Sequence, residues 1–156
     1  MKALLDTSFF FRLLDSEDPL HKNAKIYFEY MLTNDFDLYV STIAIAEFCV
    51  RNPLEHLPLR NLRILPFNVF HAQEAGRIYR LVRDEKEKRG AEKLKREVVQ
   101  NDSKQFGQAV NETFDWFVSS DSEALKVYDI FKDVVVHKFE YIDINIPCNL
   151  TIGELF

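Results

Sequence analysis

Residues 1–15 read MKALLDTSFFFRLLD, and this stretch predicts a strand and a helix with an acid between them. The apolar run over residues 3–5 has the length of a buried strand, and the aromatic segment after it predicts a helix over residues 8–14. Between them stand Asp6 and two hydroxyl residues, Thr7 and Ser8. A carboxylate at the end of a buried strand either caps the next helix or holds a positively charged ligand.

The composition indicates one folded domain spanning residues 1–156. Hydrophobic residues make up 47% of the chain and charged residues 29%, enough to build an apolar core with a polar surface. No apolar stretch approaches the roughly 20 residues that a membrane span needs, and we expect no secretory signal. Cys49 and Cys148 have no metal-type spacing and cannot form a disulfide framework, so we expect a cytoplasmic protein.

The charge is unevenly distributed along the chain. The net charge of −5 argues against a general nucleic-acid binder. Between Arg77 and Glu97, however, nine basic and five acidic residues give +4, and the remainder of the chain is −9. We interpret residues 84–100 as a charged helical insertion. The candidate nucleic-acid contacts are Arg77, Arg80, Arg83, Lys93 and Arg96. For any one of them, a solvated helix face with ion pairs one turn apart is the favoured alternative.

Short strand-like runs alternate with helix-like segments along the whole chain. Strands are predicted over residues 2–5, 36–40, 62–67 and 115–119, with a fifth at either 134–139 or 139–146. Helices are predicted around 20–31, 41–51, 69–89, 101–114 and 120–133, and Gly90 is a candidate break before a helical segment over 91–100. Single strands separated by helices predict crossover units and a mainly parallel α/β sheet.

Acidic residues recur where these strands end. Asp6 follows the first strand, Glu47 lies early in the helix after the second, and Asp121 follows the fourth. Ligands of open parallel sheets bind outside the carboxyl ends of the strands, so these acids are expected at one edge. Asp102 opens the helix that leads into the fourth strand, and its spacing alone does not place it there.

Helix capping explains some of these acids equally well. Asp6 is as good an N-cap as it is a functional residue. Ser120 and Glu123 match a capping box, which makes Asp121 an ordinary acid of a first helical turn. Asn101 and Asp102 likewise resemble a conventional helix start. Taken singly, the last two acids favour the capping interpretation.

Glu47 is the strongest argument for a ligand. It is the one charged residue between Ser41 and Val50, and a lone carboxylate in so apolar a helix is costly to bury. An ion pair with Arg51 would contribute only about 0.2–0.5 kcal/mol. A divalent cation removes the repulsion among clustered carboxylates. Oxygen ligands without a His or Cys cluster indicate Mg²⁺ or Mn²⁺, and water acidified by such an ion can attack a phosphodiester.

The ordered segments LLDTSFF, STIAIAEF, NDSKQFGQA and FVSSDSEA resemble the PIN-domain family of metal-dependent nucleases over nearly the whole chain. The resemblance implies a three-layer α/β/α fold with a central five-stranded parallel sheet. It implies that Asp6, Glu47, Asp102 and Asp121 hold Mg²⁺ or Mn²⁺ and carry out catalysis. Thr7, Ser8 and Ser119 would then be hydrogen-bond partners of these ligands.

The same resemblance implies a function and partners. Members of this size are often VapC-like toxins of toxin–antitoxin pairs, which are endoribonucleases, usually dimeric and inhibited by a partner protein. The resemblance thus implies an RNA substrate, a cognate antitoxin and a homodimer. The final twelve residues, NIPCNLTIGELF, have no counterpart in the family pattern.

Two other functions are alternatives to the nuclease. One is a non-catalytic module of the same fold that binds RNA or protein. The other is an aspartyl-phosphate protein, which ranks low because Ser8 stands where a phosphatase has its second Asp. Phe9, Phe10 and Phe11 resemble a base-stacking platform, but core and dimer contacts are the favoured interpretation because stacking aromatics are normally exposed.

Overall fold

The computed structural model describes residues 1–89 and 96–155. Five strands form one sheet in the order β3-β2-β1-β4-β5, and all neighbouring strands are parallel. The strands are β1 (Lys2–Leu5), β2 (Asp37–Ser41), β3 (Arg63–Leu65), β4 (Trp116–Ser119) and β5 (Glu140–Asp143). The helices are α1 (Thr7–Leu14), α2 (His21–Thr33), α3 (Thr42–Phe48), α4 (Val69–Arg89), α5 (Arg96–Asn111), α6 (Ser122–Phe131) and α7 (Cys148–Leu155). Two short 3₁₀ helices, Leu54–His56 and Leu59–Asn61, precede β3.

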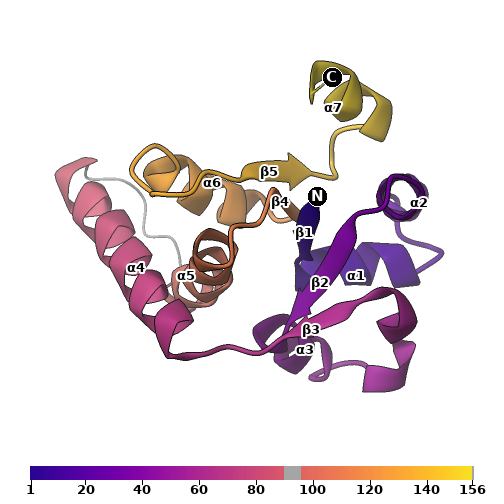
Figure 1. The fold of residues 1–156 in the computed structure, drawn as a ribbon, viewed down its shortest axis with the longest axis horizontal. Helices are drawn as coiled ribbons and strands as arrows, with labels where there is room; N and C mark the ends of the chain where they lie inside the picture. The colour runs from indigo at the N-terminus through magenta and orange to yellow at the C-terminus, as the bar shows by residue number, and fades with distance from the viewer. Residues whose placement is uncertain (90–95, 156) are drawn as a thin grey trace.

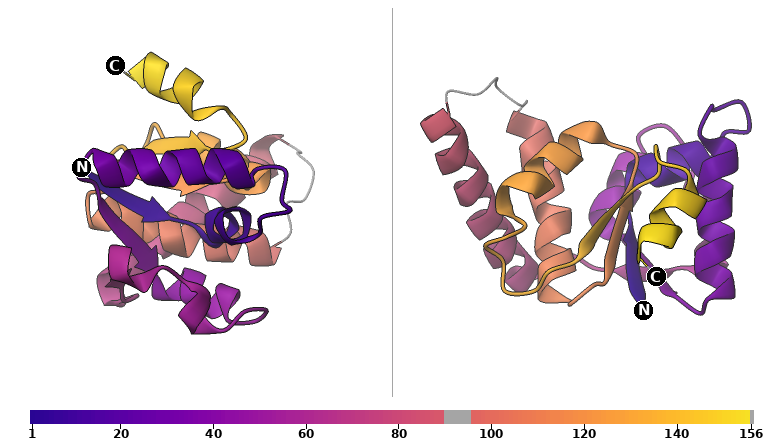
Figure 2. Two further views of the ribbon diagram at one scale, coloured as in Figure 1. Left: turned by 90° about the vertical axis from the view of Figure 1, so that its right-hand side faces the viewer. Right: turned by 90° about the horizontal axis from the view of Figure 1, so that it is seen from above.

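Helices cover both faces of the sheet, which confirms the predicted three-layer α/β/α architecture (Figures 1 and 2). Successive residues of a strand point to opposite faces, so β1 contributes to two cores. Ala3 and Leu5 pack with side chains of α1, α2 and α3. Leu4 packs with side chains of α4, α5 and α6. Each core is closed by its own set of helices, and the sheet separates them.

The packing of α4 against α5 depends on Gly107. A Cβ atom at this position would lie 2.7 Å from the backbone nitrogen of Ala75 and 2.9 Å from the carbonyl oxygen of His71. Both atoms belong to the backbone of α4, which cannot move aside as a flexible side chain can. The two helices therefore approach more closely than any residue with a side chain would allow.

The structure corrects one predicted helix boundary and selects one of the two predicted fifth strands. The predicted helix start at Asn101 is wrong, because α5 begins at Arg96 and passes through Asn101 without a break. Val99, Phe106 and Val110 lie on one side of this helix and are buried in the same core, so the apolar stripe extends the helix past its capping signal. Of the two alternatives for the fifth strand, the later one is correct. The predicted break at Gly90 and most of the following segment lie outside the described residues.

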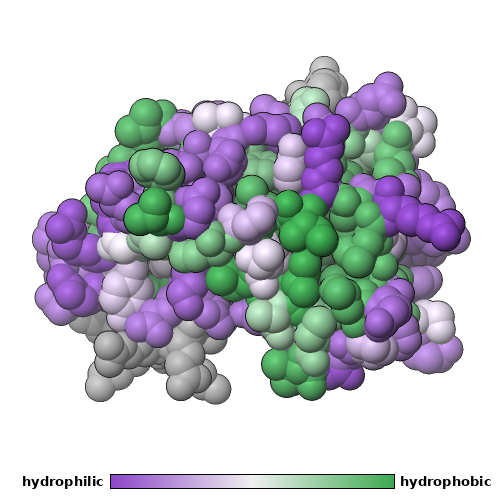
Figure 3. Space-filling model, turned by 60° about the horizontal axis from the view of Figure 1, so that its bottom comes forward, coloured by the Kyte–Doolittle hydropathy of each residue, from purple (hydrophilic) through white to green (hydrophobic). Residues whose placement is uncertain are grey.

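Apolar side chains also gather on one outer face. Figure 3 shows them near the middle of the face that carries α3 and β3 in Figure 1. Exposed apolar residues on these elements and beside them include Val50, Ile64 and Phe70, which are 80%, 50% and 64% exposed. No helix in the described part of the chain has the length and apolar character to cross a membrane.

Candidate functional site

Asp6 lies where β1 leaves the sheet, at its carboxyl edge. Its backbone N–H still donates to the carbonyl of Val118 on β4 at 3.0 Å, while its side chain is 7% exposed. The side-chain oxygens accept three hydrogen bonds. Gln105 Nε2 donates to Oδ1 at 3.0 Å, and the hydroxyls of Ser8 and Ser119 both donate to Oδ2 at 2.8 Å. Asp6 holds the N-cap position of α1 but makes no capping hydrogen bond, so the capping interpretation is wrong.

The two serines are themselves fixed by the backbone of the loop after β4. Ser8 Oγ accepts the N–H of Ser120 at 3.0 Å, and Ser119 Oγ accepts the N–H of Asp121 at 3.1 Å. Each hydroxyl therefore accepts from a peptide and donates to Asp6. This arrangement locks the direction of both hydroxyl protons and the orientation of the carboxylate.

Glu47 reaches the same edge from α3. Ser41 caps this helix by accepting the N–H of Ile43 at 3.0 Å. Thr7 Oγ1 donates to Glu47 Oε2 at 2.7 Å, and Asn101 adds a second side-chain hydrogen bond. No ion pair between Glu47 and Arg51 occurs within the described residues, although their spacing would allow one. Burial, helped by repulsion from Asp6 and Asp121, raises the pKa of Glu47.

Asp102 belongs to the second turn of α5, which projects it toward the edge. Its Oδ2 is buried and has no hydrogen-bond partner within the described structure. Burial first, and then repulsion from Asp6, Asp121 and Glu47, raises the pKa of Asp102 to about 8. A buried carboxylate oxygen without a donor is unusual, because such groups are normally satisfied. Asp102 is the group at this edge that most needs a cation.

Asp121 combines capping with a place at the edge. Its Oδ1 accepts the backbone N–H groups of Glu123 at 2.8 Å and Ala124 at 3.4 Å, so Asp121 is the N-cap of α6. The predicted capping box began one residue earlier, at Ser120, and that assignment is wrong. Tyr141 on β5 fixes the same loop by donating its hydroxyl to the carbonyl of Asp121 at 2.7 Å.

The four acids line one cavity of about 450 Å³. Its remaining lining residues are Thr7, Ser8, Phe11, Val50, Arg51 and Asn101. The structure thus brings Asp102 to the edge where the spacing of the sequence did not place it. No three His, Cys, Asp or Glu side chains of the described chain form a preassembled metal-binding group. The hydroxyl and amide donors described above hold Asp6 and Glu47 instead.

Sequence reasoning missed the amides that hold the two central acids. Gln105 lies three residues after Asp102, one helical turn along the same face of α5, and donates to Asp6. Asn101 immediately precedes Asp102 and bonds Glu47. Their positions beside Asp102 on one helix were the available signal.

Three basic candidates of the charged segment lie on α4, and two of them have acidic neighbours. Arg77 Nη2 lies 2.6 Å from Glu74 Oε1, and Arg83 Nη2 lies 3.1 Å from Asp84 Oδ1. Arg80 is exposed. Lys93 lies outside the described residues, as does the side chain of Arg96. A role for this segment in RNA binding stays a prediction.

Comparison with solved structures identifies the fold. VapBC2 from Rickettsia felis, bound to a DNA fragment from its promoter, contains a chain that matches with a TM-score of 0.58 and 17% identity, covering 92% of this chain and 100% of that one. VapC20 from Mycobacterium tuberculosis, a sarcin-ricin loop cleaving toxin, matches at 0.56 and 15% identity, over 80% and 93% of the two chains. DNA-bound VapBC from Salmonella typhimurium matches at 0.56 and 15%, over 90% and 98%.

These likenesses extend over nearly the full length of each neighbour, so this chain has the fold of a VapC-like PIN domain. The fold confirms the resemblance seen in the sequence. No family model and no curated protein sequence matches the chain.

Proposed function

We propose that this protein is a Mg²⁺- or Mn²⁺-dependent endoribonuclease. One observation carries the proposal: four carboxylates from four separate segments line a single cavity, and one of them keeps a buried oxygen without a hydrogen-bond donor. The fold supports it, since one structural neighbour is a toxin that cleaves the sarcin-ricin loop.

The donor set fits a hard divalent cation. Asp6, Glu47, Asp102 and Asp121 offer only carboxylate oxygens, the ligands that Mg²⁺ and Mn²⁺ prefer. A cation at this position would supply the missing partner of Asp102 and offset the repulsion that raises the pKa values of Asp102 and Glu47. When bound, the ion stabilises charge on phosphodiester oxygens and lowers the pKa of water.

The residues around the proposed ion have different roles. Ser8, Ser119 and Gln105 hold the Asp6 carboxylate in one orientation. Thr7 fixes Glu47, whose raised pKa suits a group that accepts a proton from the attacking water. Asp102 must release its proton to become a ligand, so activity should rise with pH through the pKa of this carboxyl group.

Two measurements on the purified protein test the proposal. Calorimetric titration with Mn²⁺ should show saturable binding, and a labelled single-stranded RNA should be cut in the presence of Mn²⁺ and left intact with EDTA. Asp6→Asn should lose both, with circular dichroism showing that the fold persists. RNA cleavage at the wild-type rate by this variant would show that the assignment is wrong.

A second candidate is a non-catalytic module of the same fold that binds RNA or protein. The observation in its favour is that the described chain contains no preassembled group of three metal-binding side chains. The Mn²⁺ titration separates the two candidates, because a module has no need of the ion. Absence of Mn²⁺ binding at any pH up to 9 would favour the module.

The proposal includes partners and a location. Two of the neighbours are VapBC complexes, which supports a cognate antitoxin for this chain. A homodimer is proposed as well, because β3 is an edge strand that leaves Ile64 half exposed and a second copy could cover it. Sedimentation equilibrium of the isolated chain tests the dimer. A toxin acting on cellular RNA would work in the cytoplasm.

A further inference from the structure

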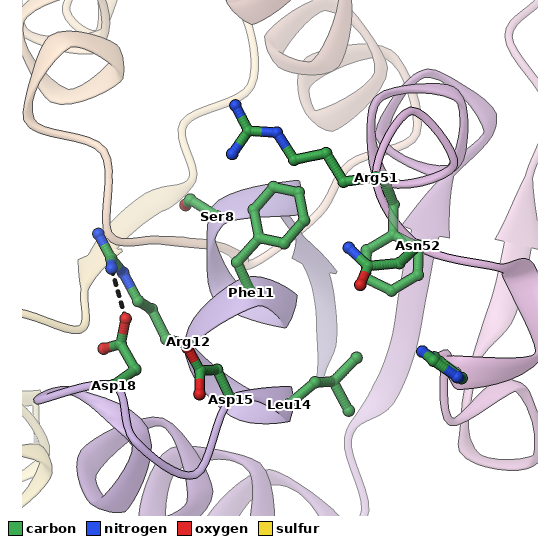
Figure 4. A pocket seen from close by; sticks show the side chains of 10 residues that line it. Ser8, Phe11, Arg12, Leu14, Asp15, Asp18, Arg51 and Asn52 are labelled. Atoms are coloured by element: carbon green, nitrogen blue, oxygen red, sulfur yellow. Dashed lines mark hydrogen bonds and ion pairs between the residues drawn. The ribbon is translucent and has the colours of Figure 1, made fainter.

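A second hollow lies beside the acid-lined cavity. This second hollow, the α1–α3 groove, has a volume of about 630 Å³ (Figure 4). Its walls include Ser8, Phe11, Arg12, Arg51 and Asn52. Three of its residues, Ser8, Phe11 and Arg51, also line the acid-lined cavity, so the two spaces lie side by side and share a wall.

One face of α1 extends from the acids into the groove. Ser8, Phe11, Arg12 and Asp15 follow the spacing of a single helical face and all line the groove. Ser8 donates to Asp6, so this face begins at the carboxylate cluster. A chain molecule held at the acids would therefore continue along α1 over Phe11.

Phe11 differs from the two phenylalanines before it. Phe9 and Phe10 are 0% and 1% exposed and belong to the core, as their favoured interpretation predicts. Phe11 is partly exposed, and its ring stacks on the buried ring of Phe48 with centroids 5.7 Å apart and planes 21° apart. Phe48 thus supports the Phe11 ring from within, as a stacking platform requires.

Arg51 provides a cation beside this platform. Its guanidinium carbon lies 5.9 Å from the centre of the Phe11 ring, and in Figure 4 the side chain extends over the ring toward Ser8. Arg51 is exposed and forms no ion pair with a described acid. By contrast, Arg12 is engaged, with Nη1 2.6 Å from Asp18 Oδ2. Arg51 can therefore move aside without breaking an ion pair, and base stacking on an aromatic ring outweighs an exposed cation–π contact.

We propose that the α1–α3 groove binds an unpaired nucleotide next to the scissile phosphate, with its base stacked on Phe11 and its phosphate contacted by Arg51. This inference rests on the proposed ribonuclease activity of the adjacent acids. An aromatic ring with an adjacent arginine is the usual means of holding a splayed base of single-stranded RNA. A basic peptide drawn to the acids would meet Arg51, whose charge opposes it, so RNA is the favoured occupant.

Binding of a fluorescein-labelled single-stranded RNA, followed by anisotropy in Mg²⁺, tests the groove. The Asp6→Asn background prevents cleavage during the measurement. Phe11→Leu keeps the apolar contact with Phe48 but loses the stacking surface, so affinity should fall by about 5- to 150-fold. Phe11→Trp should retain the wild-type affinity. Phe70→Leu, at an exposed position on α4, is the matched control and should leave affinity unchanged.

Arg51→Gln tests the phosphate contact by its salt dependence. Loss of one contact to a single strand should lower the slope of log Kd against log salt by about 0.7. Arg60→Gln, on the short helix before β3, is the matched control and should keep the slope. A duplex of the same sequence should bind more weakly than the single strand, because its bases are not free to stack.

The outcomes separate the groove from the catalytic proposal. If the wild-type protein cuts RNA but Phe11→Leu binds as tightly as Phe70→Leu, the groove proposal is wrong and the nuclease stands. If the wild type cuts no RNA but binds it in a Phe11-dependent way, the groove proposal is supported and the ribonuclease proposal is wrong. If neither the wild type nor any variant binds RNA, the groove proposal is wrong. Unchanged RNA affinity together with loss of a co-expressed partner protein by Phe11→Leu would assign the groove to that protein.

Discussion

The two edges of the sheet treat acidic residues in opposite ways. At the amino edge, Asp37 Oδ1 lies 2.7 Å from Arg63 Nη2, and Glu112 Oε1 lies 2.7 Å from His71 Nε2. At the carboxyl edge, none of the four acids forms an ion pair with a described residue. Two of these acids, Glu47 and Asp102, instead have raised pKa values, because burial and repulsion from neighbouring carboxylates disfavour their charged forms. Carboxylates held in such an unfavourable setting are expected where a ligand binds.

The largest difference between the two edges is expected in the rate of RNA cleavage. Asp6→Asn removes the central carboxylate of the proposed metal site and should reduce RNA cleavage more than about 100-fold. Asp115→Asn, at the amino edge, changes a carboxylate that accepts the N–H of Lys2 at 2.7 Å and should leave the rate within about threefold. Initial rates of RNA cleavage at saturating Mn²⁺ measure both. Equal losses in the two variants would remove the distinction between the edges.

A smaller loss is expected when only the support of Asp6 is removed. Ser119→Ala deletes a fully buried hydroxyl that donates to Asp6 and accepts the N–H of Asp121. Removing such a supporting partner should lower Mn²⁺ affinity and cleavage by about 10- to 100-fold. Ser119→Thr keeps the hydroxyl and should recover part of both. An unchanged melting temperature of Ser119→Ala, together with weaker Mn²⁺ binding, would show that Ser119 positions Asp6. A lower melting temperature would instead indicate a loss of structure.

At the amino edge, loss of an acid should lower the stability of the fold and leave Mn²⁺ affinity unchanged. His71 is fully buried, and its Nδ1 accepts the N–H of Asn68 at 3.1 Å, so its proton resides on Nε2 and points to Glu112. Glu112→Ala leaves that N–H unpaired and should lower the free energy of unfolding by about 1–3 kcal/mol. Urea denaturation measures it. A change in Mn²⁺ affinity of the folded variant would contradict the separation of the edges.

At the carboxyl edge, loss of an acid should instead stabilise the cation-free protein. The folded state holds the Asp102 proton up to a pKa of about 8, whereas the unfolded chain releases it near the ordinary aspartate pKa of 3.8. Between these values the folded state binds more protons, so stability falls as pH rises through this window. Asp102→Asn should flatten that decline and melt a few degrees higher than wild type at pH 8–9 in EDTA. Melts from pH 5 to 9 that decline equally in both proteins would refute the assignment.

The smallest effect is expected for an exposed pair. Asp37 and Arg63 are 45% and 65% exposed, so their ion pair should contribute no more than about 1 kcal/mol. Asp37→Asn should therefore change the free energy of unfolding by less than Glu112→Ala does, and the difference should shrink further in high salt. Urea titrations at low and high ionic strength make the comparison.

The contrast between the edges was only partly visible in the sequence. Strand-length apolar runs predicted the parallel sheet, and the sheet placed Asp6, Glu47 and Asp121 at one edge, because local patterns determine these features. Asp102 lies with them because α5 packs in a core built by distant residues, in which Val99 is buried, and no local pattern reports that packing.

Side-chain partners were the least predictable part of the site. Glu47 has a basic residue at ideal spacing, yet it bonds Thr7 and Asn101, which come from two other helices. Phe11 was grouped with Phe9 and Phe10, although helical rotation leaves it partly exposed at the edge of the core. Both outcomes follow from how α1, α3 and α5 meet, and that geometry exists only in the folded chain.

The division of the molecule into two apolar cores has a consequence for its lifetime. Asp6 and Glu47 belong to elements of one core, and Asp102 and Asp121 to elements of the other. An ion shared by all four would join the layers as a cross-link does, closing long loops of the chain. We expect the chelated protein to be cut faster by proteases and to exchange its core amide hydrogens sooner, even under conditions in which both forms are folded.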